Sequence, residues 1–167
     1  RKILIFYGGV DATDETRKIV EAIADFQQHD IHVDVVITER YLHRREISTG
    51  ISALPNMSLH IQLPSLAKLM SEASISFGAG GGTTYERLFF GLPSIVTTTA
   101  ANQVASIRYM HEKNLVCWLG NAEDVQKCDL LNALTQAIEN SSNLCEQSRA
   151  SSQIVDGKSL DRIANLL

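Results

Sequence analysis

Short, uninterrupted apolar runs alternate with stretches of helical periodicity along most of the chain, and this alternation limits the possible folds more than any other feature. The first run, Ile3 to Tyr7, stops at Gly8-Gly9, and Asp14 to Gln28 then places apolar side chains at helical spacing. A short run that is apolar throughout is typical of a strand in a parallel sheet with helices on both faces. The pattern predicts an α/β fold with a doubly wound parallel sheet of about six strands.

The other predicted elements continue the alternation of strands and helices. Strands are predicted at 33–37, 57–62, 73–77, 93–97 and 115–119, and helices at 40–46, 66–72, 83–90, 102–113 and 124–139, with one or two more in the tail from 143 to 167. The segment with Gly50 and Pro55 is interpreted as a loop, and Gly157 as a helix break. Ligands of such sheets bind where the carboxyl ends of the strands lead into helices, so the site is sought there.

Composition and charge narrow the class of protein. A net charge of -4 disfavours nucleic acid as a partner. The basic cluster of Arg40, His43, Arg44 and Arg45 is interpreted as a solvated helix face. Three cysteines without CxxC spacing indicate a reducing, cytoplasmic setting. No apolar run approaches the ~18 residues of a membrane span.

The length of 167 residues fits one domain. The chain opens with Arg1-Lys2 and enters an apolar run at Ile3 without an initiator methionine. We therefore expect residues 1–167 to be a single domain taken from a longer protein.

The strongest chemical signal is the glycine-rich segment from Gly78 to Gly82, which follows a predicted strand and precedes a helix that begins with Thr83-Thr84. Glycines permit positive φ and let an anion approach bare N–H groups. The helix start adds unpaired donors, and a threonine can cap the helix or donate to a phosphate oxygen. The segment predicts a phosphate-binding loop. The alternative is a tight crossover in which the glycines only relieve packing.

Known phosphate-loop templates do not fit this segment. A Walker loop needs lysine followed by serine or threonine, where this chain has Thr83-Thr84-Tyr85. A dinucleotide fingerprint starting at Gly78 would need glycine at position 83, and it belongs on the first βα unit, which reads Gly8-Gly9-Val10-Asp11. NAD, and ATP bound in the P-loop manner, are therefore disfavoured.

Three other features lie at the same predicted edge of the sheet. Glu86, one turn into the helix, is placed to accept hydrogen bonds from ribose hydroxyls, or it only stabilises the helix start. Gly8-Gly9 can offer backbone donors to a phosphate, or it is a simple turn. Asn102-Gln103 supplies amides that suit sugar hydroxyls and acetamido groups, although Asn102 could instead cap a helix.

No self-sufficient catalytic group is evident. The histidines at 29, 32, 43, 60 and 111 do not pair at metal-ligand spacing, and there is no Gly-x-Ser-x-Gly elbow. Asp11, Asp14 and Glu15 are interpreted as the first turn of a helix. We expect no metal and no cofactor.

With these residues identified, the stretch from Gly78 to Gln103 resembles the carboxyl-terminal domain of GT-B-fold nucleotide-sugar enzymes. The resemblance rests on the glycine-rich loop, Thr83-Thr84-x-Glu86, Gly91-Leu92-Pro93 and Asn102-Gln103. The segment is similar to the glucosaminyltransferase that makes the peptidoglycan lipid intermediate. It is more similar to the UDP-sugar hydrolase of pseudaminic acid biosynthesis and to related polysaccharide-biosynthesis proteins.

The second resemblance also includes Gly8-Gly9-x-Asp11 and the segment from Ser65 to Met70, and it spans roughly residues 3 to 118. The hydrolase has Ser-Ala-Ser-Ser where this chain has Gly78-Ala79-Gly80-Gly81. The tail beyond Gly120 finds no match in it.

The resemblance implies a role for each matching position. Glu86 would hold the ribose, and Leu63-Pro64-Ser65-Leu66 would frame the uracil, largely through its backbone. The diphosphate would be held by Gly80, Gly81, Gly82, Thr83 and Thr84, with Gly8 and Gly9 approaching from the other side. Asn102 and Gln103 would face the sugar, and Asn102 would lie near the reaction.

The resemblance also implies an activity. The chain would be the UDP-sugar-binding half of a two-domain hydrolase of bacterial surface-glycan synthesis, which needs no tightly bound metal. Its catalytic histidine would lie on an amino-terminal domain outside this sequence, and water would attack the anomeric carbon. The alternative is the same half of a GT-B glycosyltransferase. A more distant alternative is a non-catalytic α/β regulatory module.

Overall fold

The computed structural model of the chain describes residues 1–26, 30–158, 162 and 164. The strands are β1 (Lys2–Phe6), β2 (His32–Ile37), β3 (Met57–Ile61), β4 (Ile75–Ala79), β5 (Ser94–Thr98) and β6 (Cys117–Asn121). The helices are α1 (Glu15–Ala24), α2 (Arg44–Ser52), α3 (Ala67–Glu72), α4 (Thr83–Phe89), α5 (Ala101–Glu112), α6 (Lys127–Glu139) and α7 (Ser141–Ser152).

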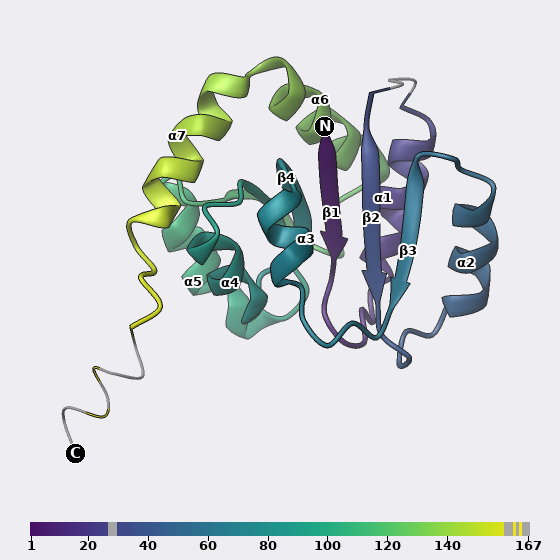
Figure 1. Cartoon of the computed structure of the whole chain (residues 1–167), viewed down its shortest axis with the longest axis horizontal. Coiled ribbons are helices and arrows are strands. Elements are labelled where there is room, and N and C mark those ends of the chain that lie inside the picture. The colour runs from purple at the N-terminus through teal and green to yellow at the C-terminus, as the bar shows by residue number, and fades with distance from the viewer. Residues whose placement is uncertain (27–29, 159–161, 163, 165–167) are drawn as a thin grey trace.

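The six strands form one sheet in the order β3-β2-β1-β4-β5-β6, and every neighbouring pair is parallel. This confirms the predicted doubly wound fold, and the order is that of a Rossmann sheet. The chain goes from β1 to β2 and β3 on one side, then crosses back through α3 to β4 on the other (Figure 1). The reversal of direction lies between β1 and β4.

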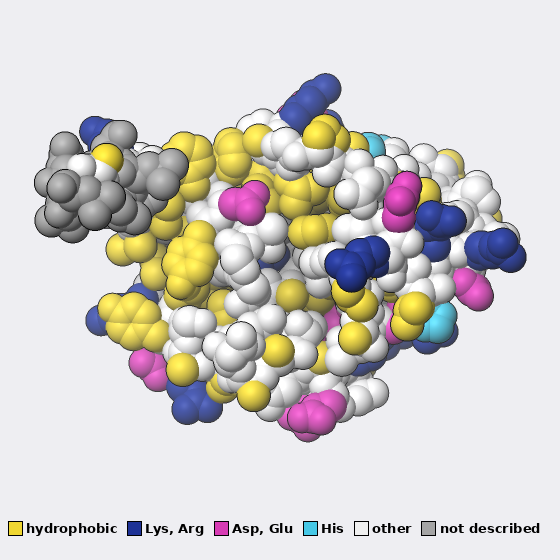
Figure 2. Space-filling view, turned by 90° about the horizontal axis from the view of Figure 1, so that it is seen from below, with side chains coloured by type: hydrophobic (Ala, Val, Ile, Leu, Met, Phe, Trp, Pro, Cys, Tyr) yellow, Lys and Arg dark blue, Asp and Glu magenta, His cyan; other side chains and the backbone are white. Residues whose placement is uncertain are grey.

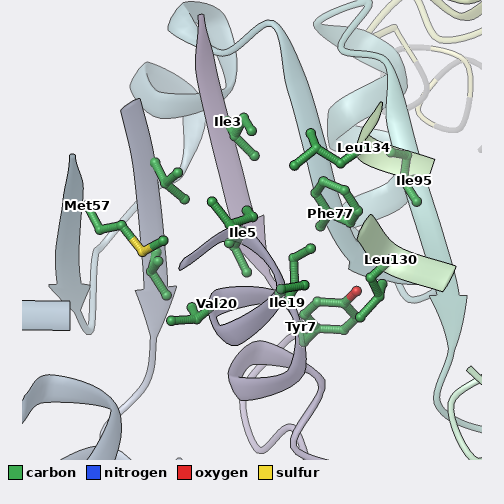
Figure 3. Close-up of a cluster of buried hydrophobic side chains, with 14 of the residues drawn as sticks. Ile3, Ile5, Tyr7, Ile19, Val20, Met57, Phe77, Ile95, Leu130 and Leu134 are labelled. Carbon is green, nitrogen blue, oxygen red and sulfur yellow. The ribbon is translucent and has the colours of Figure 1, made fainter. Parts of the chain in front are cut away.

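Alternate residues of β1, β2, β5 and β6 belong to different apolar clusters, which explains the continuous apolar runs in the central strands. Ile3 and Ile5 of β1 belong to the larger cluster with α1 and α6, shown in Figure 3. Leu4 points to the other face, where it packs with Met70 of α3. On that face Leu88 of α4 joins residues of α5 and β5 in a third cluster. Both faces of the sheet are therefore covered.

Helix α2 is the main error in the predicted elements. It was expected at 40–46 but runs from Arg44 to Ser52, so Gly50 is helical rather than part of a loop. The buried side chains of Ile47 and Ile51, one turn apart, carry the helix. Packing of these two residues outweighs the low helix propensity of the Ser-Thr-Gly run between them.

The ends of several other helices and strands also differ from the prediction. Strands β4 and β6 begin and end two residues later than expected, and α6 begins at Lys127 rather than at 124. Helix α1 is described to Ala24, and the last residues of its predicted range, together with His29, lie outside the described residues. In the tail, α7 packs against α4 and α6. Most of the tail beyond 158 lies outside the described part.

Candidate functional site

Two glycine loops meet where the sheet reverses direction. In β1 and β4, Phe6 and Gly78 are register partners, so the loops that follow these strands leave the same edge side by side. One loop contains Gly8-Gly9 and the other Gly80–Gly82. Ligands of doubly wound sheets bind in this crevice. The structure thus places side by side the two segments that were expected at the same edge of the sheet.

The glycine loop is shorter than the sequence indicated, because Gly78 and Ala79 are the last residues of β4. The run does not use the positive φ that glycine permits, since the described glycines that adopt it are Gly8, Gly91, Gly120 and Gly157. Gly82 has helical dihedrals, with φ -56° and ψ -35°. Glycine at 78 and 80 is needed because a Cβ there would lie within 3 Å of neighbouring atoms, and not because of an unusual backbone conformation.

The amides of the loop are available to a ligand. Among the described residues, no acceptor takes the backbone N–H of Gly81 or Gly82. A side chain at Gly82 would meet no atom within 4 Å, and one at Gly81 would meet only the Gln103 Nε2, at 3.9 Å. Thr83 is half-buried at the first position of α4. The Gly81–Thr83 backbone therefore lines open space at the edge of the sheet.

Gly80 and Thr84 also make close contacts within the protein. A Cβ at Gly80 would lie 2.6 Å from Ile107 Cγ1, so this glycine allows α5 to pack closely. Thr84 is fully buried, and its hydroxyl donates to the Ala79 carbonyl at 3.3 Å. Its backbone N–H donates to the Gly81 carbonyl at 3.0 Å. An outward-facing Thr84 hydroxyl does not fit this geometry.

The Gly8-Gly9 loop is open in the same way. Gly8 has a φ of +90°, which disfavours other residues, and a Cβ at Gly8 or Gly9 would meet nothing within 4 Å. The Thr38 hydroxyl at the end of β2 donates to the Gly9 carbonyl. This bond ties the loop to the neighbouring strand.

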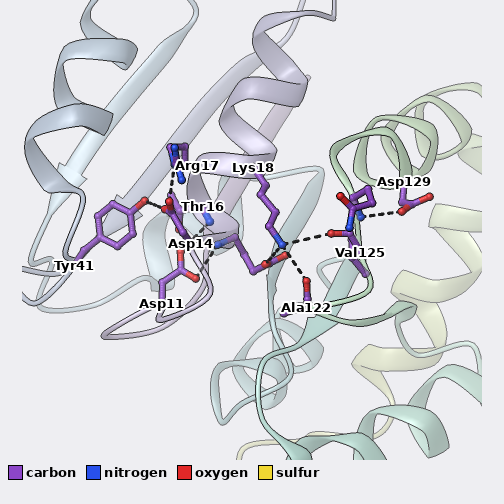
Figure 4. A network of polar contacts seen from close by, with 11 residues as sticks. Asp11, Asp14, Thr16, Arg17, Lys18, Tyr41, Ala122, Val125 and Asp129 are labelled. Carbon is purple, nitrogen blue, oxygen red and sulfur yellow. Dashed lines mark hydrogen bonds and ion pairs between the residues drawn. The ribbon is translucent and has the colours of Figure 1, made fainter.

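Acidic residues fix the start of α1 and thereby this loop (Figure 4). The carboxylate of Asp11 accepts hydrogen bonds from the N–H groups of Glu15 at 3.0 Å and Thr16 at 2.8 Å. The Tyr41 hydroxyl donates to Asp14. These acids serve the helix start, as interpreted from the sequence. Burial is the main cause that raises the pKa of Asp11.

Lys18 connects the start of α1 to the loop between β6 and α6 (Figure 4). Its ammonium lies 2.6 Å from Glu15 Oε1 and donates to the carbonyls of Ala122 at 2.9 Å and Val125 at 3.4 Å. The Glu15 side chain is fully buried, and burial raises its pKa. The link holds two loops of the carboxyl edge together.

The expected ribose and uracil positions also lie at this edge. Glu86 is exposed in the first turn of α4, and within the described ranges its carboxylate makes no hydrogen bond or ion pair. The loop from β3 to α3 passes across the carboxyl ends of β2 and β1 (Figure 1). In that loop Leu66 is buried, Leu63 is half-buried and Ser65 is exposed.

The start of α5 completes the edge. The N-cap is Ala100, so Asn102 does not cap the helix, and its side chain is exposed. Gln103 accepts a hydrogen bond from the Thr99 N–H at 2.9 Å, so its oxygen is used within the protein. A cavity of about 340 Å³ lies beside this turn, lined by residues of the loops after β1, β5 and β6. Its lining includes Thr98, Thr99, Ala101 and Asn121.

Arg87 is a feature that the sequence interpretation missed. It is only 2% exposed, and its Nη2 donates to the Ala79 carbonyl at 2.7 Å and to the Thr84 hydroxyl at 2.9 Å. The signal was present, because Thr84, Arg87 and Leu88 have the i, i+3, i+4 spacing of a buried helix face.

Figure 2 views the molecule from the carboxyl edge of the sheet. Backbone and uncharged side chains occupy most of its middle, and Lys and Arg form no continuous patch there. In the described ranges no group of three or more His, Cys, Asp or Glu residues is arranged to hold a metal ion. None of the described helices has the length and apolarity needed to cross a membrane.

Comparison with known proteins supports the same architecture. No protein-family model matches the chain. The spore coat polysaccharide biosynthesis protein SpsG of Bacillus subtilis is 24% identical over 170 residues, covering 100% of this chain and 50% of SpsG. The chain thus spans about half the length of this relative.

Solved structures share the fold at low sequence identity. The Staphylococcus aureus MnaA–UDP complex superposes with a TM-score of 0.78 and 17% identity, over 99% of this chain and 43% of MnaA. WaaG, a glycosyltransferase involved in lipopolysaccharide biosynthesis, gives 0.75 and 16%, over 99% of this chain and 46% of WaaG. The chain therefore has the Rossmann-like fold of one half of a GT-B enzyme, as its sequence predicted.

Proposed function

We propose that the chain binds the UDP part of a nucleotide sugar at the edge between β1 and β4. One observation carries the proposal: Gly8-Gly9 and Gly80–Gly82 lie side by side at the sheet reversal, and the Gly81 and Gly82 amides have no acceptor among the described residues. Bare amides in a crevice suit phosphate oxygens. The fold shared with the MnaA–UDP complex supports the same ligand class.

The proposed contacts follow the edge from one loop to the next. The Gly81–Thr83 backbone and Gly8-Gly9 hold the diphosphate from two sides. Glu86, exposed one turn further along α4, accepts from the ribose hydroxyls. The backbone of Leu63–Leu66 frames the uracil. Asn102 faces the sugar, beside the cavity of about 340 Å³.

The reaction is proposed to be sugar transfer in polysaccharide biosynthesis. The roles of SpsG in spore coat polysaccharide biosynthesis and of WaaG in lipopolysaccharide biosynthesis support a polysaccharide pathway, and WaaG supports a glycosyltransferase over a hydrolase. Hydrolysis of a UDP-sugar, as in the pseudaminic acid pathway, remains the second candidate because of the sequence resemblance. In either case the domain anchors UDP, and a second domain supplies the acceptor or water and the main catalytic residue. Asn102 is proposed to assist at the sugar end.

Calorimetry with UDP tests the binding proposal. We expect the chain to bind UDP with a dissociation constant of about millimolar or below. Glu86→Ala should weaken binding by about tenfold, because a carboxylate that accepts from hydroxyls contributes a charge-assisted bond. Glu112→Ala, which removes an exposed carboxylate at the end of α5, is the matched control. Absence of UDP binding would refute the proposal, and unchanged affinity in Glu86→Ala would remove Glu86 from the site.

A product assay separates the two reactions. The full-length protein is incubated with a UDP-sugar in the absence and in the presence of an acceptor. A transferase should release stoichiometric UDP only with the acceptor. Stoichiometric free sugar without an acceptor would instead establish hydrolysis.

A further inference from the structure

A charged side chain lies buried near the carboxyl ends of β1 and β4, where the two glycine loops begin. Arg87 is 2% exposed, and its guanidinium occupies the space where a side chain at Gly78 would project, next to the Phe6 carbonyl. Phe6 and Gly78 are the paired residues at which β1 and β4 approach their carboxyl ends. The positive charge therefore lies at the sheet reversal, on one face of the sheet, and it bonds to Ala79 and Thr84 on either side of the loop 80–83.

Among the described residues the guanidinium has only neutral hydrogen-bond partners, although the exposed carboxylate of Glu86 is near enough to favour its charged form. Nη2 donates to the Ala79 carbonyl and the Thr84 hydroxyl, and the buried Nε has no partner among the described residues. In the described part of the chain, no carboxylate lies within 4.0 Å of the guanidinium. Burial lowers the pKa of Arg87 to about 10, so the group stays charged at neutral pH.

A buried charge without a counter-ion is costly, and proteins usually pair it. Neutral residues could hold the glycine loop equally well, since an amide can donate to a carbonyl and a hydroxyl. What only a cation adds is attraction for negative charge through a low-dielectric wall. The Arg87 bonds to Ala79 and Thr84 flank the segment 80–83, in which the Gly81 and Gly82 amides have no acceptor among the described residues.

We propose that Arg87 is a positioning residue whose buried charge makes the site select a diphosphate over a monophosphate or a neutral nucleoside. The inference rests on the proposed function and deepens it. The charge acts from beside the loop, and the bonds to Ala79 and Thr84 keep the loop backbone directed at the ligand. The substrate class is accordingly a nucleoside diphosphate ester rather than a sugar monophosphate.

The test compares the ligand preferences of charge-removing and charge-retaining variants. Affinities for UDP, UMP and uridine are measured by calorimetry or NMR titration in the wild type, Arg87→Gln and Arg87→Lys. Arg45→Gln, which removes an exposed charge on α2, is the matched control. We expect Arg87→Gln to reduce the preference for UDP over uridine by about tenfold or more, the worth of one charge-assisted interaction. Arg87→Lys and Arg45→Gln should keep that preference within about threefold.

The outcomes distinguish this inference from the proposed function. If the wild type binds UDP but Arg87→Gln weakens UDP, UMP and uridine equally, Arg87 is only structural and the inference is wrong. If the wild type does not bind UDP, both fail. If Arg87→Gln does not fold, the test uses the ligand preference of Arg87→Lys and the NMR spectrum of the wild type instead. The Arg87 Nε–H resonance should shift with UDP and not with uridine, and no shift with UDP would overturn the inference.

Discussion

Arg87 occupies the space that a side chain at Gly78 would need, so these two residues form a matched pair on one face of the sheet. A methyl group at position 78 would overlap the guanidinium and would lie 2.5 Å from the Phe6 carbonyl oxygen. Gly78→Ala should therefore lower the free energy of unfolding by about 1–3 kcal/mol, as overpacking does. Urea denaturation measures the change. Gly50→Ala is the control, because a Cβ there meets nothing within 4 Å and the residue is helical.

Gly82 should behave in the opposite way. Its dihedrals are helical and a Cβ would enter open space, so Gly82→Ala should leave stability unchanged or raise it by up to about 1 kcal/mol. The same methyl group would stand where the diphosphate is proposed to lie. Affinity for UDP should thus fall by about tenfold without loss of stability. An unchanged affinity would argue against close approach of the ligand at Gly82.

The Asp11 carboxylate accepts two backbone hydrogen bonds at the start of α1, from Glu15 and Thr16. Asp11→Ala should destabilise the protein by about 0.5–2 kcal/mol, the usual effect of losing a helix cap. Asp11→Asn keeps one acceptor oxygen and should destabilise the protein less than Asp11→Ala does. Thermal or urea unfolding ranks the three proteins, and equal stability of Asp11→Ala and the wild type would contradict this role.

The buried Glu15 predicts a pH dependence. Burial raises the pKa of Glu15 in the folded state above its ordinary value of 4.5. Between the unfolded and the folded pKa the native state holds more protons, so stability falls as pH rises through that window. The unfolding free energy of the wild type should therefore fall relative to that of Glu15→Gln as the pH rises from about 4. Urea denaturation at several pH values measures it, and a difference that moves the other way would show that Lys18 dominates.

Gln147 of α7 accepts a hydrogen bond from the Ser94 N–H at 2.8 Å and is 4% exposed. Gln147→Ala leaves that buried N–H unpaired and should cost about 1–3 kcal/mol. Gln136→Ala, at an exposed position of α6, is the control. An unchanged free energy of unfolding in Gln147→Ala would mean that α7 is not an integral part of the fold.

The fold could be predicted because a strand that is buried on both faces is apolar along its whole length, as in the run Ile3–Tyr7. The order of the strands could not be predicted, because the register between β1 and β4 depends on contacts between residues 72 positions apart, such as Ile3 and Ile75. Helix α2 was misplaced because only tertiary burial of Ile47 and Ile51 overrides its poor helix propensity.

The candidate site, like the fold, could be predicted only in part. Glycine runs and the Gly8-Gly9 turn are local signals, and both loops lie at the predicted edge. The roles of individual residues depend on three-dimensional neighbours. Gly80 meets Ile107, and Thr84 turns inward to bond with Arg87, and neither contact is visible in local sequence.

The most direct test of the account is the position of UDP on the domain, measured by amide chemical-shift changes in a ¹⁵N-labelled sample. We predict that UDP produces the largest shifts at Gly8, Gly9, Gly81, Gly82 and Thr83. Binding whose shifts cluster at the opposite, amino-terminal edge of the sheet, around Gln147 and Ser94, would contradict it.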